Sequence, residues 1–224
     1  MNEADLAGLA TVVADRLCGT HEHICVALIR QLALGQPVSA AQLAAQIAME
    51  EPAVDAVLRQ MSDIDYDSAG NVVGFGLSMV PTAHQFIING RTLYTWCALD
   101  TFLYSALLGQ PCEVVSHCPV TARPITLAMT PEDISKLSPT SSVISLVIPD
   151  GSVADCRRSA FCNYGHFFAT AEAGAAWLHD HPNGIILPIA DAHRLGQLLA
   201  NHRLLLAGHE GMARSDSGNG VRFP

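Results

Sequence analysis

The spacing of the apolar residues changes along the chain, and this change limits the folds that the chain can adopt. Over residues 3–62 apolar side chains such as Leu6, Leu9 and Val13 recur every three to four positions, the period of an amphipathic helix. From Pro81 onward, strand-like and helix-like segments follow one another. The sequence therefore predicts an α+β fold, with a helical N-terminal region followed by a mixed-sheet α/β domain.

Local residue types divide the N-terminal region into separate elements. The sequence Gly35-Gln36-Pro37 interrupts the helical pattern, Ser39 can cap the next helix, and Pro52 suits the first turn of another. Residues 64–75 then have the pattern of a β-hairpin, with its turn at residues 68–71. Helices followed by a hairpin predict a winged-helix-like arrangement.

The second region has predicted strands, helices and one well-defined turn. The Asn89-Gly90 turn joins two of the strands in a hairpin. The predicted strands are Gln85–Ile88, Arg91–Leu93, Glu113–His117, Ile125–Met129, Ser142–Ile148, His166–Ala169 and Ile185–Ile189. The predicted helices are Tyr94–Leu108, Ala171–Leu178 and Ala190–Asn201. We expect a helical, winged-helix-like domain over residues 1–80, a second domain over 81–207 and a flexible tail over 208–224.

The charge balance argues against nucleic acid as a partner. The chain has 12 basic and 21 acidic residues, a net charge of -9, and Lys136 is its single lysine. Phosphate-backbone binding depends on Lys and Arg. The helix in the recognition position, Pro52–Ser62, carries one basic residue, Arg59, against Asp55. A winged-helix pattern without a basic recognition helix predicts a structural role for this region.

The N-terminus and the cysteines predict a cytoplasmic protein. Glu3 and Asp5 stand where a secretory signal needs positive charge, and no apolar run approaches the roughly 20 residues of a membrane helix. We therefore expect no membrane partner. The seven cysteines are odd in number and form no CxxC pair. This pattern predicts free thiols in a reducing compartment.

Cys97 and Asp100 are the first candidate for chemistry. If residues 94–108 form a helix, the two side chains lie on one face, roughly 5–6 Å apart at their Cβ atoms. A lone buried cysteine is commonly a core residue. An aspartate in this apolar run, however, is a costly buried charge, and desolvation would raise its pKa toward that of a proton carrier.

The remaining cysteines point less clearly to a site. Cys162 lies in a dense aromatic run, where packing and chemistry are both open interpretations. Cys18 and Cys25 are interpreted as packing residues of the N-terminal helices. The other three cysteines are spaced too widely for a zinc knuckle: Cys112, Cys118 and Cys156. The histidines show no spacing typical of metal ligands.

Three segments together resemble the alkylmercury (organomercurial) lyases of bacterial mercury resistance. They are Trp96-Cys97-Ala98-Leu99-Asp100-Thr101, Ser116-His117-Cys118, and Phe161-Cys162 with His166-Phe167-Phe168. The likeness extends from Met79 to the helix near Gly196, with a similar helical region before it, and so covers most of the chain.

The resemblance implies cleavage of a carbon–mercury bond by protonolysis, which gives a hydrocarbon and Hg(II). It implies that Cys97 and Cys162 bind mercury, that Asp100 is the proton shuttle beside the metal, and that Cys118 is structural. The family pattern implied by the resemblance has a second cysteine directly after the catalytic one, where this chain has Asn163.

The implied partners are organomercurial small molecules, and no organic cofactor is expected. Thiols would remove the Hg(II) product, supplied either by a low-molecular-weight thiol or by mercuric reductase. Thiolates are the ligands that a soft ion such as mercury prefers. Trp96, Phe161 and Phe168 are expected to form an apolar wall around the organic group.

Two alternatives stay open from the sequence. One is a cysteine-based, metal-responsive winged-helix regulator, which would need the basic recognition helix that is missing. The other is a non-catalytic soft-metal carrier. The regulator also gives Asp100 no role.

Overall fold

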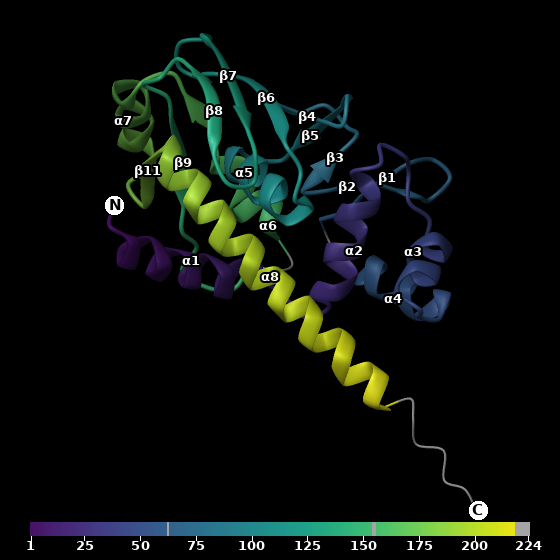
Figure 1. Cartoon of the computed structure of the whole chain (residues 1–224). Coiled ribbons are helices and arrows are strands. Elements are labelled where there is room, and N and C mark those ends of the chain that lie inside the picture. Colours follow the sequence, from purple (N-terminus) through teal and green to yellow (C-terminus); the bar gives the residue numbers. More distant parts are fainter. Residues whose placement is uncertain (62, 154–155, 218–224) are drawn as a thin grey trace, which may run out of the picture.

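A computed structural model describes residues 1–61, 63–153 and 156–217, with side chains described up to residue 210. Four helices open the chain and lie at one end and along one side of the molecule (Figure 1). They are α1 (Glu3–Leu17), α2 (Glu22–Leu32), α3 (Ala40–Gln46) and α4 (Glu51–Gln60). The predicted helical N-terminal region is confirmed.

The helix starts follow from the residues at their N-termini. The Asn2 side chain caps α1, and Ser39 forms the predicted capping box with Gln42 at the start of α3. Pro52 occupies the first turn of α4, as expected. These caps satisfy backbone N–H groups that have no partner within their helix.

The larger sheet has eight strands and continues from the N-terminal region into the second region. Its order is β1-β2-β3-β5-β4-β6-β7-β8. The strands are β1 (Asp65–Tyr66), β2 (Val72–Phe75), β3 (Leu77–Ser78), β4 (His84–Ile88), β5 (Arg91–Thr95), β6 (Cys112–His117), β7 (Pro124–Met129) and β8 (Ile134–Ser138). Both predicted hairpins are confirmed, with Asn89 and Gly90 at positive φ in the turn between β4 and β5.

A smaller sheet has the order β10-β9-β11, with β9 (Val143–Val147) in the centre. Its edge strands are β10 (Phe167–Phe168) and β11 (Gly184–Pro188), and α7 (Ala171–Asp180) follows β10. Every strand pair among the described residues is antiparallel. The α+β class is therefore confirmed, whereas the predicted mixed sheet is wrong because no helical crossover returns a strand in parallel.

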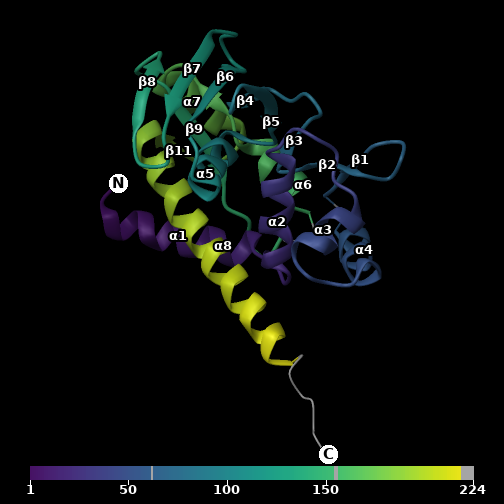
Figure 2. The same cartoon turned by 45° about the vertical axis from the view of Figure 1, so that its right-hand side comes forward.

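Helix α5 (Ala98–Leu108) is the central helix of the core, and α8 (Ile189–Ser217) packs across it. The crossing is close at Gly196, where an added Cβ would lie 2.6 Å from Phe102 Cβ. Only glycine allows the two helices to approach this far. In Figures 1 and 2, α8 continues past α1 and α2 and ends away from the sheets.

Helix α8 extends well beyond its predicted end at Asn201. The expected frayed tail from Gly208 is helical as far as Ser217, and residues 218–224 lie outside the described residues. Glu210 supplies the physical reason, because its carboxylate accepts hydrogen bonds from the N–H groups of His21 and His23 at 3.1 and 3.0 Å. None of the helices described is long and apolar enough to cross a membrane.

Candidate active site

Cys97 lies at the junction between β5 and α5. The predicted helix from Tyr94 is wrong at its start, because β5 pairs with its neighbours through Thr95 and the helix begins at Ala98. Cys97 is the extended N-cap residue, with φ -144° and ψ 169°. Asp100 is the third helical residue, and N-cap and N3 are the two positions that face each other in a capping box. The two side chains thus meet across the N-terminus of the helix, and not on one face within it as predicted.

Cys162 reaches the same place on a short segment after α6 (Arg157–Ala160). It begins the 3₁₀ turn η1 (Cys162–Tyr164), and Gly165 follows. The Ala98 N–H donates to the Gly165 carbonyl at 2.9 Å, which ties the two backbones together. An added Cβ at Gly165 would lie 2.7 Å from Cys97 Cβ. A glycine is therefore what lets the second thiol approach the first.

The Ser145 side chain on β9 fixes this segment from its other side. Its hydroxyl donates to the Tyr164 carbonyl at 2.6 Å and accepts from the His166 N–H at 3.1 Å. Both bonded backbone groups belong to residues only two and four positions after Cys162. The smaller sheet therefore holds the thiol segment against the start of α5.

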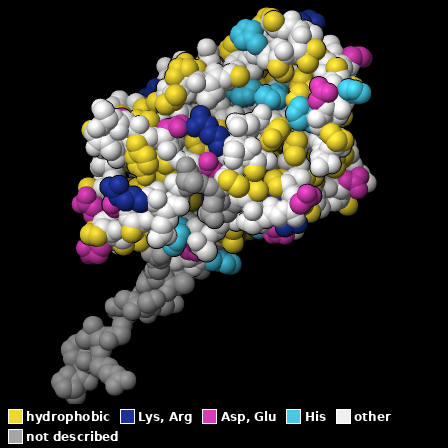
Figure 3. Space-filling model, turned by 180° about the vertical axis from the view of Figure 1, so that it is seen from behind, with side chains coloured by type: hydrophobic (Ala, Val, Ile, Leu, Met, Phe, Trp, Pro, Cys, Tyr) yellow, Lys and Arg dark blue, Asp and Glu magenta, His cyan; other side chains and the backbone are white. Residues whose placement is uncertain are grey.

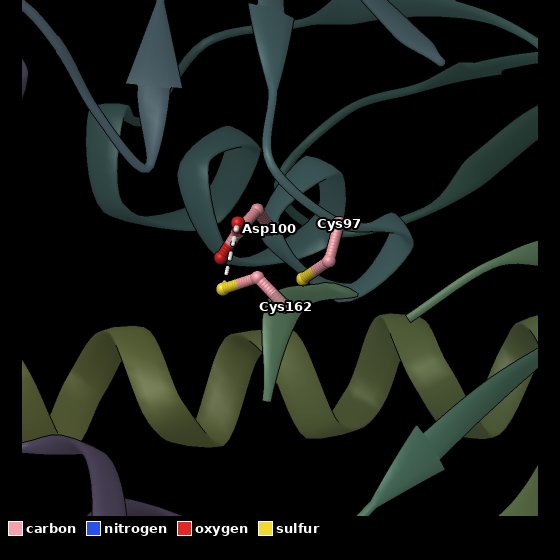
Figure 4. Close-up of side chains that lie close together, drawn as sticks. All are labelled: Cys97, Asp100 and Cys162. Atoms are coloured by element: carbon pink, nitrogen blue, oxygen red, sulfur yellow. Dashed lines mark hydrogen bonds between the residues drawn. The ribbon is translucent and has the colours of Figure 1, made fainter. Parts of the chain in front are cut away.

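The structure brings the three predicted site residues together. The ligand atoms of Cys97, Asp100 and Cys162 all lie within 4.8 Å of one another, and the three side chains point toward a common centre (Figure 4). The Cys162 thiol donates to Asp100 Oδ2 at 3.9 Å. The exposed fractions are 0% for Cys97, 7% for Asp100 and 6% for Cys162. Two thiols and a carboxyl group thus share one site with little exposure to solvent.

Burial controls the protonation of these groups. It raises the pKa of Asp100 to about 6, although the Cys97 thiol and the charges of Arg203 and Arg157 act in the opposite direction. Burial also raises the pKa of Cys97 well above its ordinary value, and its hydrogen bond to Cys162 adds to this. For Cys162, the hydrogen bond from Cys97 lowers the pKa, but burial and the Asp100 charge raise it overall. Asp100 is accordingly the group whose proton is most easily exchanged near neutral pH.

A pocket with about 530 Å³ of empty space, part of it open to solvent, leads to Asp100 and Cys162. Cys97 is fully buried and is not among the residues that line this pocket. Trp96 and Phe161 line the pocket as predicted, whereas Phe168 does not and packs against Trp177 instead. The remaining lining residues come mainly from α1, α5, α6 and α8: Ala14, Leu17, Cys18, Phe75, Gly76, Leu103, Tyr104, Arg157, Leu199 and Arg203.

The charged residues of this wall were missed by the sequence analysis. Arg203 is buried on α8 and donates from Nε to Glu22 Oε2 at 2.8 Å. Arg157 places its guanidinium over the Phe75 ring, 5.1 Å from the ring centroid. The ion pair joins residues 181 positions apart. No local pattern could have indicated it, although an arginine in the apolar pattern of α8 was a weak sign of a buried partner.

The other cysteines are not part of this group. Cys25, Cys112 and Cys118 are buried as free thiols, Cys156 is exposed, and Cys18 lies on the pocket wall. The interpretation of Cys25 as a packing residue is confirmed, but Cys18 also borders the pocket. Within the described part of the chain, the only cluster of three potential metal ligands is Cys97, Asp100 and Cys162.

Helix α4, in the predicted recognition position, carries a single basic side chain, and that side chain is paired. On α4, Arg59 is paired with Asp55 at 2.7 Å. On the face shown in Figure 3, the Lys and Arg side chains are scattered, with Asp and Glu side chains near them. This distribution is unfavourable for binding a phosphate backbone.

Comparisons with known proteins identify the family. The model of the alkylmercury lyase family matches residues 77–201, and that of the helix-turn-helix domain of alkylmercury lyase matches residues 8–76. The chain belongs to the alkylmercury lyase family. The resemblance noted in the sequence is thereby confirmed, and nothing in the comparisons favours a metal-responsive regulator.

Three curated relatives, each named alkylmercury lyase, support this assignment. The protein from Streptomyces lividans is 42% identical over 172 residues, which is 77% of this chain and 79% of that protein. The protein from Pseudomonas putida is 42% identical over 180 residues, or 80% of this chain and 84% of that protein. The protein from Staphylococcus epidermidis is 39% identical over 172 residues, again 77% and 79%.

A solved structure shares the fold of this alkylmercury lyase. The crystal structure of the mercury-bound form of MerB2 superposes with a TM-score of 0.71 at 26% sequence identity. The match covers 90% of this chain and all of the other. The shared architecture therefore extends over most of this chain.

Proposed function

We propose that this alkylmercury lyase cleaves the carbon–mercury bond of organomercurials with Cys97, Cys162 and Asp100. The observation that carries the proposal is the meeting of two thiols and one carboxyl group within 4.8 Å, beside an apolar pocket. These three groups are the parts that protonolysis needs: two soft ligands for the metal and one acid for the carbon.

The two thiols have a defined chemical task. Thiolate sulfur binds a soft metal ion far better than oxygen or nitrogen does. An alkyl or aryl carbanion is a poor leaving group, so the bond to mercury resists water. When a second sulfur binds the metal, electron density shifts toward the carbon, which becomes more basic. Cys97 and Cys162 are close enough to act on one mercury atom in this way.

Asp100 carries the proton. As a carboxylate it accepts the proton of one thiol while that sulfur binds mercury. It then donates this proton to the carbon, which keeps the electron pair of the broken bond. A pKa near 6 suits both steps, because a general acid–base group works best when its pKa is close to the working pH.

The atoms balance without an oxidant or a reductant. Two thiols and one organomercurial with its external ligand give the mercury bis-thiolate, the hydrocarbon and the protonated external ligand. One thiol proton leaves on the carbon and the other on the external ligand. Holding all the reacting groups in one pocket replaces a multi-body encounter with a single bound step, which lowers the barrier by several kcal/mol.

External thiols complete the cycle by removing Hg(II) from the two cysteines. A low-molecular-weight thiol exchanges readily with a mercury thiolate, and mercuric reductase is the proposed protein acceptor. The seven free cysteines favour a reducing, cytoplasmic setting. Trp96 and Phe161 give the pocket an apolar wall that accommodates a methyl, ethyl or phenyl group.

The test is hydrocarbon release from phenylmercury in the presence of excess thiol, measured as benzene. We expect Cys97→Ser and Cys162→Ser each to lower the rate at least about 100-fold, with Cys156→Ser as an exposed control. Asp100→Asn is expected to bind mercury but to release benzene about 10²- to 10⁴-fold more slowly. Undiminished release in either serine variant would overturn the mechanism, and rapid turnover of Asp100→Asn would mean another proton donor.

A further inference from the structure

The pocket wall has three buried N–H donors that lack an acceptor. They are Trp96 Nε1, Arg157 Nε and Arg203 Nη2, and no hydrogen-bond partner within the described part of the chain reaches them. All three residues line the pocket that also holds Asp100 and Cys162. A buried donor without a partner is costly, and such groups are normally satisfied. Three of them around one pocket point to an acceptor that is brought by a ligand.

The charges around the pocket indicate what kind of acceptor this is. Arg203 donates from Nε to the Glu22 carboxylate, which compensates its charge. Its Nη2 group has no partner, although the residue is only 8% exposed. Arg157 forms no salt bridge with any described carboxylate. Its neighbour Arg158, by contrast, is paired with Asp65 at 2.8 Å. Arg157 is therefore a cation of this wall without a salt-bridge partner among the described carboxylates, and Arg203 keeps one free N–H group beside it.

We infer that this pocket binds a carboxylate of the substrate, held by Arg157 and Arg203 while mercury binds at the two cysteines. The preferred substrates are then organomercurials that carry a carboxylate. This inference rests on the proposed function, because the cysteines fix where the mercury lies. A carboxylate matches the donors, since guanidinium groups donate paired hydrogen bonds to its two oxygens and a hydrogen bond to a charged group is about twice as strong as a neutral one.

The carboxylate has two chemical sources, and the pocket recognises the same group in both. It can be part of the organic group, as in 4-mercuribenzoate. It can also be part of the thiol that mercury carries into the site, as in phenylmercury bound to mercaptoacetate. The pocket that borders Asp100 and Cys162 is partly open to solvent, so a carboxylate from either source can approach it from outside.

Paired substrates separate the two sources. The first arm compares kcat/KM for 4-mercuribenzoate and phenylmercury, both supplied with uncharged mercaptoethanol, and measures benzoate and benzene. The second arm compares phenylmercury supplied with mercaptoacetate and with mercaptoethanol. We expect a preference of about 10- to 100-fold for the carboxylated form in at least one arm. A ratio near one in both arms would overturn the inference.

Variants assign the preference to the arginines. Arg157→Gln is expected to reduce the ratio toward one, while the exposed Arg30→Gln on α2 keeps the wild-type ratio. Because Arg203→Gln alone would leave Glu22 as a buried unpaired charge, the second variant is the double Glu22→Gln/Arg203→Gln. An unchanged ratio in both Arg157→Gln and the double variant would contradict the assignment.

A binding measurement without mercury distinguishes this inference from the mechanism. Benzoate titrated into the wild-type protein by calorimetry is expected to bind, and to bind about tenfold or more weakly to Arg157→Gln than to Arg30→Gln. If no substrate releases hydrocarbon but benzoate binds in this pattern, the proposed mechanism fails and the carboxylate pocket remains. If benzoate fails to bind and the rate ratios are near one, the carboxylate inference is refuted while the proposed mechanism stands.

Discussion

At the scale of single residues, Asp100 combines the proton transfer proposed for it with a cost to the fold. The carboxylate is buried, and its pKa of about 6 lies above the ordinary value of 3.8. A raised pKa means that the folded chain binds this proton more tightly than the unfolded chain. The folded state therefore loses stability as the pH rises from about 4 to about 6, and the loss is complete above that range.

Replacing this carboxylate with an amide should stabilise the protein. For Asp100→Asn we expect the free energy of unfolding at pH 7.5 to rise by up to about 3 kcal/mol, since a shift of one pKa unit corresponds to about 1.4 kcal/mol. Near pH 4 both forms are uncharged, and the two proteins should differ little. Denaturant unfolding at both pH values measures the difference.

The exposed Asp150→Asn is the matched control, because it removes a carboxylate that is already in water. It should produce no gain that depends on pH. An Asp100→Asn variant that is no more stable than the wild type at pH 7.5 would show that the carboxylate is well accommodated in the folded chain.

Single-residue chemistry was also the part of the site most accessible from the sequence. A carboxylate in an apolar run is unusual wherever the chain places it, so Asp100 and the neighbouring Cys97 were found. Arg157 and Arg203 were missed, because their significance depends on which side chains lie opposite them. Proximity between residues distant in sequence is a property of the fold and leaves no local pattern.

At the scale of elements, the site is a contact between the start of α5 and the turn η1. The predicted helix started too early because the residue types of Tyr94 and Thr95 suit either conformation. Pairing with β3 and β4 selects the strand. Strand β3 was not predicted at all, since two residues carry no periodicity. Longer elements with a clear pattern, such as the hairpin of β4 and β5, were predicted correctly.

Gly165 controls the distance between these two elements. In Gly165→Ala the new Cβ would overlap Cys97, at 2.7 Å from its Cβ and 3.3 Å from its sulfur. The hydrogen bond from Ala98 to residue 165 keeps the backbones from separating freely, so the thiols must move apart. We expect hydrocarbon release to fall at least about tenfold, because a misplacement of about 1 Å can reduce catalysis a hundredfold.

The paired control is Gly151→Ala, where an added Cβ meets nothing within 4 Å. It should keep the wild-type rate. Mercury binding by the two variants, measured by competition with a thiol, separates displacement of the thiols from general damage to the fold. Wild-type activity and mercury affinity in Gly165→Ala would contradict the close-contact argument.

At the scale of the whole molecule, the two regions expected from the sequence are joined by one sheet and by the packing of α8. Strand β3 pairs with β2 on one side and with β5 on the other, so one sheet crosses the predicted boundary near residue 80. Helix α8 packs against α1, α2 and α5 (Figure 2). The pocket depends on this arrangement, because residues of α1 and α8 line it together with Asp100 on α5 and Cys162 on η1.

Shared packing predicts that the chain unfolds as one cooperative unit. Leu43 is fully buried in α3, near the outer end of the N-terminal region, and Leu43→Ala should cost about 2–5 kcal/mol. Both tryptophans, Trp96 and Trp177, lie beyond residue 80. If unfolding is cooperative, the tryptophan fluorescence midpoint in denaturant must shift as far as the midpoint from circular dichroism, although the mutated residue is in the other region.

Leu34→Ala, with the wild-type side chain 52% exposed, should shift neither midpoint appreciably. A dichroism transition that moves while the tryptophan transition stays fixed would mean that the N-terminal region unfolds on its own. In that case α1 could leave the pocket wall without loss of the sheets, and Cys162 and Asp100 would become accessible while α5 and η1 stay folded. Coincident shifts instead imply that the walls of the pocket are as stable as the core, so that the dry environment of Asp100 persists throughout the folded state.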